Sequence, residues 1–135
     1  MKRRSRRSKR GATLVESALV FLVFAVLIAG IMEVGIVGFA VNAITFAAHR
    51  AARFASVSGS ASGHAAASSD VQASAVSYAA PLNPTNLSVV VTWLPDNQPG
   101  SSVQVTVTYL LRPAVLPLSS TVLTLQSTAR HRIVQ

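Results

Sequence analysis

One uninterrupted apolar run dominates this chain. Residues 12–48 read ATLVESALVFLVFAVLIAGIMEVGIVGFAVNAITFAA, and the only charges among them are Glu16 and Glu33. A helix needs about 20 apolar residues to cross the roughly 30 Å of bilayer hydrocarbon. These 37 residues, at about 1.5 Å rise each, reach about 55 Å as one helix. We therefore expect a membrane-spanning helix longer than the bilayer. A crossing that starts with the run ends near Met32, with residues 34–57 beyond or along the interface.

The positive charge of the chain is concentrated at its start. The 135 residues carry a formal net charge of +8, but seven of the twelve Lys and Arg residues lie within the first ten, MKRRSRRSKR. Basic residues that flank a first apolar segment are retained on the cytoplasmic side, so we expect a cytoplasmic N-terminus and an exported remainder. A surface that binds nucleic acid spreads its basic residues over a folded face. We therefore predict no nucleic-acid partner.

A short second helix is predicted after a linker. Residues 58–69 are small and polar, as in a flexible connection. The segment 70–80 then has helical spacing, with Ser69 or Asp70 available as its N-cap and Pro81 as its stop. One face of this helix carries Val71, Ala75 and Tyr78.

The remainder of the chain changes to a period of two. Residues 87–93 and 103–109 alternate apolar with polar side chains, and the turn formers of 95–100 predict a hairpin between them. Two prolines interrupt residues 112–117, and alternation resumes over 121–133. We expect a three-stranded antiparallel sheet whose apolar face is covered by the short helix. The predicted fold class is α+β and pilin-like, with residues 70–135 as a small exported domain after a transmembrane and extended helix over 12–57.

The junction between the basic leader and the apolar run carries the most informative motif. Arg10 is followed by Gly11 and Ala12, and Glu16 comes four residues later. A secretory signal places its small-residue cleavage site after the apolar run, whereas this chain has its glycine before it. An ionised carboxylate in a transmembrane helix costs about 2.5 to 3.5 kcal/mol at mid-bilayer, so Glu16 requires a reason.

This junction resembles the type IV prepilin signal. In that signal a basic leader ends in glycine, the peptidase cuts after the glycine, and the fifth mature residue is glutamate. The resemblance implies that residues 1–11 are removed by a cut between Gly11 and Ala12 on the cytoplasmic face. It also implies that the carboxylate of Glu16 pairs with the new N-terminal amine of a neighbouring subunit.

A narrower resemblance extends beyond the signal. The segments 16–20, 30–35, 42–45 and 47–53, read in this order, are similar to the TadE-like family, minor pseudopilins of the tight-adherence (Tad or Flp) pilus system. Members usually carry Phe or Tyr after the signal glutamate, where this chain has Ser17.

The family resemblance implies a non-enzymatic role in assembling a pilus used for adhesion or secretion, at the cytoplasmic (inner) membrane. The implied partners are a prepilin peptidase, other pseudopilins or the major pilin, and the inner-membrane platform proteins of the pilus.

Small and polar residues also form a possible packing seam on the long helix. Gly35, Gly38, Asn42 and Thr45 recur at spacings of three and four, and His49 and Ala52 continue the series. Such seams let helices approach closely, so this face is a candidate contact with another subunit. An alanine-rich helix carries small residues in any case, and the interpretation that they form no contact is about equally well supported.

Glu33 is a second candidate assembly contact, although we favour a solvated position in the outer headgroup layer.

No catalytic, cofactor or metal site is predicted. His49, His64 and His131 are far apart in sequence and lack carboxylates at metal-ligand spacing. The chain has no cysteine and no nucleophile-elbow or P-loop motif, and the only acids of the exported domain are Asp70 and Asp96.

Two rival functions stay open. One is an uncleaved single-pass protein whose basic arm binds nucleic acid or anionic lipid; the other is an anchored enzyme using His64.

Overall fold

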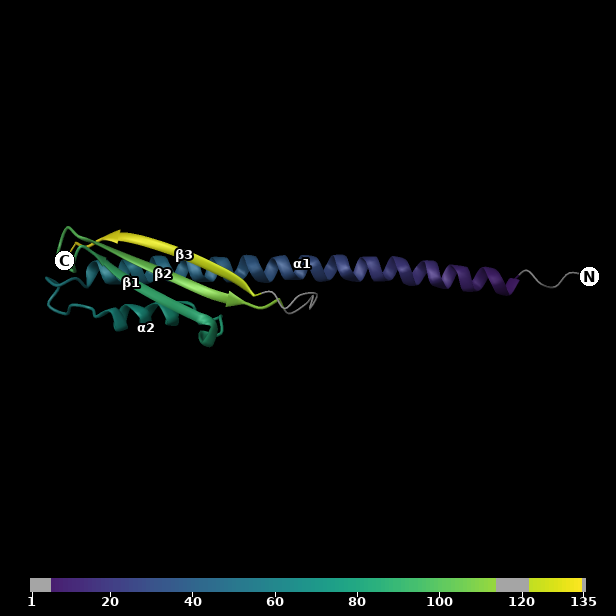
Figure 1. Cartoon of the computed structure of the whole chain (residues 1–135), viewed down its shortest axis with the longest axis horizontal. Helices are drawn as coiled ribbons and strands as arrows, with labels where there is room; N and C mark the ends of the chain where they lie inside the picture. The colour runs from purple at the N-terminus through teal and green to yellow at the C-terminus, as the bar shows by residue number, and fades with distance from the viewer. Residues whose placement is uncertain (1–5, 114–121, 135) are drawn as a thin grey trace, which may run out of the picture.

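The structure, a computed structural model, describes residues 6–113 and 122–134 and consists of one long helix, one short helix and a small sheet (Figure 1). The elements in chain order are α1 (Arg6–Val57), α2 (Ser68–Tyr78), a 3-10 turn (Pro84–Asn86), β1 (Leu87–Leu94), β2 (Ser102–Leu111) and β3 (Leu123–Arg132). The predicted α+β class, with a long apolar helix, a short helix and three antiparallel strands, is confirmed.

The first half of α1 projects alone from the rest of the molecule (Figure 1). Every residue from 11 to 28 is exposed, although the most apolar 18-residue window of the helix has a mean hydropathy of 2.7. None of that window is buried, whereas a helix from the core of a soluble protein would bury much of it. Exposed apolar side chains over this length fit a single-pass membrane protein.

The sheet has the order β1-β2-β3, and both strand pairs are antiparallel. The inward residues of the central strand, Val103, Val105 and Val107, are fully buried. The predicted hairpin turn between β1 and β2 is confirmed, and Gly100 has a φ of +94° there, which side chains rarely adopt. Asp96 stabilises this turn because its Oδ1 accepts hydrogen bonds from the backbone N–H of Gln98 and the hydroxyl of Ser101.

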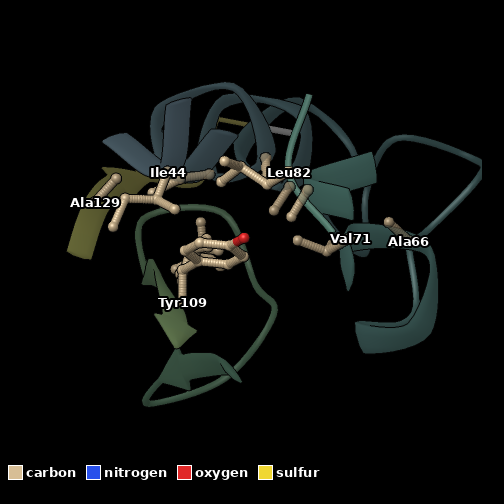
Figure 2. Close-up of a cluster of buried hydrophobic side chains, with 14 of the residues drawn as sticks. Ile44, Ala66, Val71, Leu82, Tyr109 and Ala129 are labelled. Carbon is tan, nitrogen blue, oxygen red and sulfur yellow. The ribbon is translucent and has the colours of Figure 1, made fainter. Parts of the chain in front are cut away.

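The second half of α1, rather than α2, provides the main cover of the sheet. Its buried residues, which face the sheet and α2, form a stripe made largely of alanine, which we call the alanine stripe: Ala40, Ile44, Ala47, Ala48, Ala51, Ala52 and Ala55, all 1% exposed or less. Figure 2 shows Ile44 beside Ala129 of β3 and above Tyr109 of β2. Val71 and Ala75 of α2 join the same core. The prediction that the short helix covers the sheet is therefore wrong for most of the sheet, because α1 extends over β2 and β3 while α2 packs beside β1 and α1.

The start of α2 also differs from the prediction. Its N-cap is Ala67, not Ser69 or Asp70, and the helix runs from Ser68 to Tyr78. Alanine has no side-chain acceptor, so the helix start is stabilised instead by Asp70, whose carboxylate accepts a 3.0 Å hydrogen bond from the N–H of Ala67.

The segment between the two helices is hydrogen-bonded, whereas its composition predicts a flexible connection. Ala66 N–H donates to the carbonyl of Ser58 at 2.9 Å, and Ser60 N–H donates to that of Asn97 in the hairpin turn at 3.0 Å. Residues 114–121, which include much of the proline-interrupted segment and the predicted start of the third strand at Thr121, lie outside the described residues.

We predict that Ala51→Leu destabilises the domain by about 1 to 3 kcal/mol, because a larger side chain in this filled contact forces the helix and sheet apart. Urea unfolding of the full chain in detergent micelles, followed by the fluorescence of the single tryptophan, Trp93, measures the change. The matched control is Ala73→Leu on the exposed face of α2, where we expect a change within about 0.5 kcal/mol. Equal losses at both positions would contradict the close packing of the alanine stripe.

Candidate processing and assembly site

Gly11 lies within α1, and no internal contact requires it to be glycine. The helix begins at Arg6 and continues through Gly11 and Ala12 without a break. A Cβ atom built on Gly11 meets nothing within 4 Å, and its φ is not positive. Its missing side chain therefore serves neither packing nor a turn within this chain. Glycine does weaken a helix by about 1 kcal/mol relative to alanine, which eases local unwinding of the backbone at this point.

Glu16 lies on the exposed surface of the same helix, four residues after Ala12. Residues four apart share a helix face, so the carboxylate lies on the side of Ala12. Around it, the side chains of α1 line a shallow, mostly apolar depression: Thr13, Glu16, Ser17, Val20, Phe21 and Phe24. A carboxylate on an apolar, open helix surface is accessible to a cation brought by another molecule.

The candidate site is far from the folded core. The first residues of α1 that pack into the core are Val37 and Ala40. They are more than 25 residues beyond Gly11, which corresponds to about 40 Å along a helix. Removal of residues 1–11 therefore leaves every core contact of the domain in place.

The structure places the predicted packing seam away from the sheet. Gly35, Gly38 and Asn42 are exposed and Thr45 is half-buried, while the alanine stripe occupies the opposite side of the helix. A Cβ atom at either glycine meets nothing within 4 Å. Ala52, by contrast, is fully buried in the core. The continuation of the seam through His49 to Ala52 therefore does not stay on one exposed face of the helix. The seam stays a predicted contact, and Glu33, near its start, is half-buried.

The structure brings together two histidines that the sequence separates widely. The rings of His49 on α1 and His131 on β3 form an edge-to-face contact with centroids 6.2 Å apart. With Phe46, Arg50 and Arg53 they line a depression of about 290 Å³ that contains no carboxylate.

The same face of α1 carries an aromatic contact. Arg50 lies over the ring of Phe46 at 5.1 Å from its centroid, and that ring meets Tyr78 of α2 edge-to-face at 6.0 Å. Spacing along the chain gives no signal for this cluster. The one available clue is that His131 falls on the inward side of its strand, between Ala129 and Ile133.

The arginine and histidine side chains of this cluster offer contacts to an anion. No group of three or more His, Asp or Glu residues that could hold a metal ion occurs among the described residues. The His49 and His131 pair, set beside two guanidinium groups, is electrostatically unsuited to a cation.

Comparison with known proteins agrees with the N-terminal resemblance. The family model described as TadE-like protein matches residues 11–53. Neither a curated protein nor a solved structure matches the chain significantly. The matched segment begins at Gly11, includes Glu16 and the seam, and ends within the part of α1 that packs on the sheet. The N-terminal segment of this chain, residues 11–53, is therefore TadE-like.

Proposed function

We propose that this chain is a membrane-anchored minor pseudopilin that acts in the assembly of a Tad-type pilus. The observation that carries the proposal is the division of the TadE-like segment into two halves. Its first half, residues 11–28, is largely apolar and exposed, and its second half supplies one side of the core of a folded domain. A projecting apolar helix of this kind can serve both as a membrane anchor and as the part of a subunit that packs inside a helical assembly.

The proposed topology follows from the charge distribution. Seven basic residues precede the exposed apolar helix, and such residues are retained in the cytoplasm. The N-terminus is then cytoplasmic, the helix crosses the inner membrane once, and the sheet domain lies outside.

The proposed processing step is a cut between Gly11 and Ala12 by a prepilin peptidase. An exposed glycine with no internal role, about 40 Å from the first core contact along the helix, supports it. The cut removes seven positive charges, each contributing about 1 kcal/mol of attraction to an anionic leaflet. Loss of the leader therefore makes it easier to withdraw the helix from the membrane.

The proposed assembly residue is Glu16. The cut leaves an α-ammonium group on Ala12 at a helix N-terminus, where the helix dipole disfavours a positive charge and favours a carboxylate. Glu16 lies exposed one turn away. Its carboxylate can pair with the N-terminal amine of a neighbouring subunit and so offset the cost of both charges in an apolar setting.

The partners in this proposal are the prepilin peptidase, other pseudopilins or the major pilin, and the platform proteins of the inner membrane. The role is structural rather than enzymatic, and the pilus serves adhesion or secretion. The seam of Gly35, Gly38, Asn42 and Thr45, of which the first three residues are exposed and Thr45 is half-buried, is a proposed subunit contact within the assembly.

We predict that Gly11→Val blocks processing, because a branched side chain next to the scissile bond obstructs the peptidase. N-terminal sequencing and intact mass of the protein recovered from membranes measure the outcome. The unchanged chain should begin at Ala12 and the variant at Met1. Gly30→Val is the matched control, since Gly30 is also an open position in the same helix, and this variant should be cut normally.

The same measurement tests the rival function. Residues 1–11 still attached to the unchanged protein in cells that contain the peptidase would defeat the pseudopilin mechanism. They would favour an uncleaved protein whose basic arm binds nucleic acid or anionic lipid.

We predict that Glu16→Gln allows cutting and membrane insertion but strongly reduces piliation, because the amide cannot compensate a neighbouring ammonium group. Counting pili by electron microscopy, together with N-terminal sequencing of the variant, separates the two steps. Glu33→Gln removes the same charge from the same helix and serves as the control. Normal piliation in the Glu16 variant, or equal losses in both, would contradict a specific role for position 16.

A further inference from the structure

The two carboxylates of α1 indicate where the bilayer lies along the helix, given the membrane span of the proposed function. Glu16 and Glu33 are 17 residues apart, which is about 25 Å along a helix. This is close to the roughly 30 Å of hydrocarbon, and carboxylates are costly at its centre. Centring the bilayer between them puts both near its boundaries. The hydrocarbon then covers about residues 15–34.

One end of the sheet reaches down to this outer boundary. At the far end, Val134 N–H donates to the carbonyl of Ser56 at 3.0 Å, which ties the sheet to the last turn of α1. From Ser102 to Leu111, β2 runs from this far end toward the middle of α1 over about 30 Å. About 20 residues of α-helix cover the same distance. Leu111 is therefore level with Val37, which belongs to the same core cluster. Figure 1 shows the end of β2 and the start of β3 beside the middle of α1.

Several of the large side chains exposed at this level are apolar, beside polar ones such as Thr124, the partner of Leu110 on β3. Leu110 is 44% exposed, Val122 40%, Leu123 38% and Phe39, on α1, 55%. The exposed cation Arg112 follows β2 directly. The hairpin turn at the opposite end, residues 95–100, carries Asp96, Asn97 and Gln98, and Val134 and Val57 are exposed at that end as well.

The height of these residues matches the lipid headgroups. Val37 is three residues outside the boundary near Val34, or about 5 Å along the helix. The headgroup layer is about 5 to 8 Å thick on each side of the bilayer. Apolar side chains with a nearby cation suit this layer, where hydrocarbon and phosphate are both within reach.

We propose that this end of the domain, formed by Leu110, Arg112, Val122 and Leu123, is a second membrane contact seated in the outer headgroup layer. The contact holds the β2–β3 end against the lipid and so limits the tilt of α1 relative to the bilayer. Withdrawal of a subunit into a pilus must then break this contact as well as extract the helix.

The absence of cysteine makes the experiment direct, because a single introduced cysteine takes a spin label at one known position. The full chain is reconstituted in vesicles of phosphatidylcholine and phosphatidylglycerol with the label at Leu123→Cys, Leu22→Cys or Val90→Cys. Leu22 lies in the span, and Val90, 56% exposed on the outer face of β1, is the aqueous control. Collision rates with oxygen, which concentrates in lipid, and with a water-soluble nickel chelate are measured for each.

We expect the label at Leu123 to resemble the one at Leu22, with high oxygen and several-fold lower nickel collision than the label at Val90. Nickel collision as high as at Val90, with Leu22 still protected, would overturn the second contact and leave the span intact. Water exposure at both Leu22 and Leu123 would remove the span as well. Low collision with both reagents at Leu123 would show cover by protein rather than lipid, and would also overturn the proposal. A label at Leu110→Cys repeats the test from the neighbouring strand.

Discussion

The close contact between the alanine stripe of α1 and the central strand is the interaction on which the rest of the domain depends. A three-stranded sheet cannot remain folded with a bare apolar face, and the inner face of β2 is a row of fully buried valines. Alanine side chains let the helix axis approach that face closely, and Ile44 is the one large side chain of the stripe, buried above Tyr109 (Figure 2). The short helix then closes the side next to β1, with Val71 and Ala75 in the same core.

The same helix therefore has two environments, and its composition changes where the environment changes. Large apolar side chains such as Phe21, Leu22 and Phe24 occupy the projecting half, where none of the described residues covers them and they suit a membrane span. From Ala40 onward the sheet-facing positions become small. No proline or helix break separates the halves, although Gly30, Gly35 and Gly38 lie where they meet.

Local patterns predicted most of the elements but not how they pack. The period-two alternation of residues 87–93 and 103–109 placed two strands to within two residues of their observed ends, because one buried face imposes that period. The cover of the sheet could not be predicted, because a helix face that meets a sheet and one that meets lipid are equally apolar. The cap of α2 was assigned to Ser69 or Asp70 because propensity favours a side-chain acceptor there, whereas Asp70 acts from within the helix. The contact of His49 with His131 depends on the docking of α1 on β3, which no spacing in the chain encodes.

Contacts within the fold explain the residues of the core but not those of the candidate site. In the core, each residue is explained by its neighbours: Ala51 must be small because a valine-lined sheet lies against it. Gly11 and Glu16 have no such explanation, since a side chain at Gly11 would meet open space and the carboxylate of Glu16 is exposed on an apolar helix. Open space alone does not distinguish Gly11, because Gly30 is equally open. What distinguishes it is its place between a basic leader and an apolar run, with a carboxylate one turn beyond the following residue. The two positions therefore stay predictions from the sequence, because the contacts within the fold neither require nor explain them, whereas the packing of the domain is visible only in the structure.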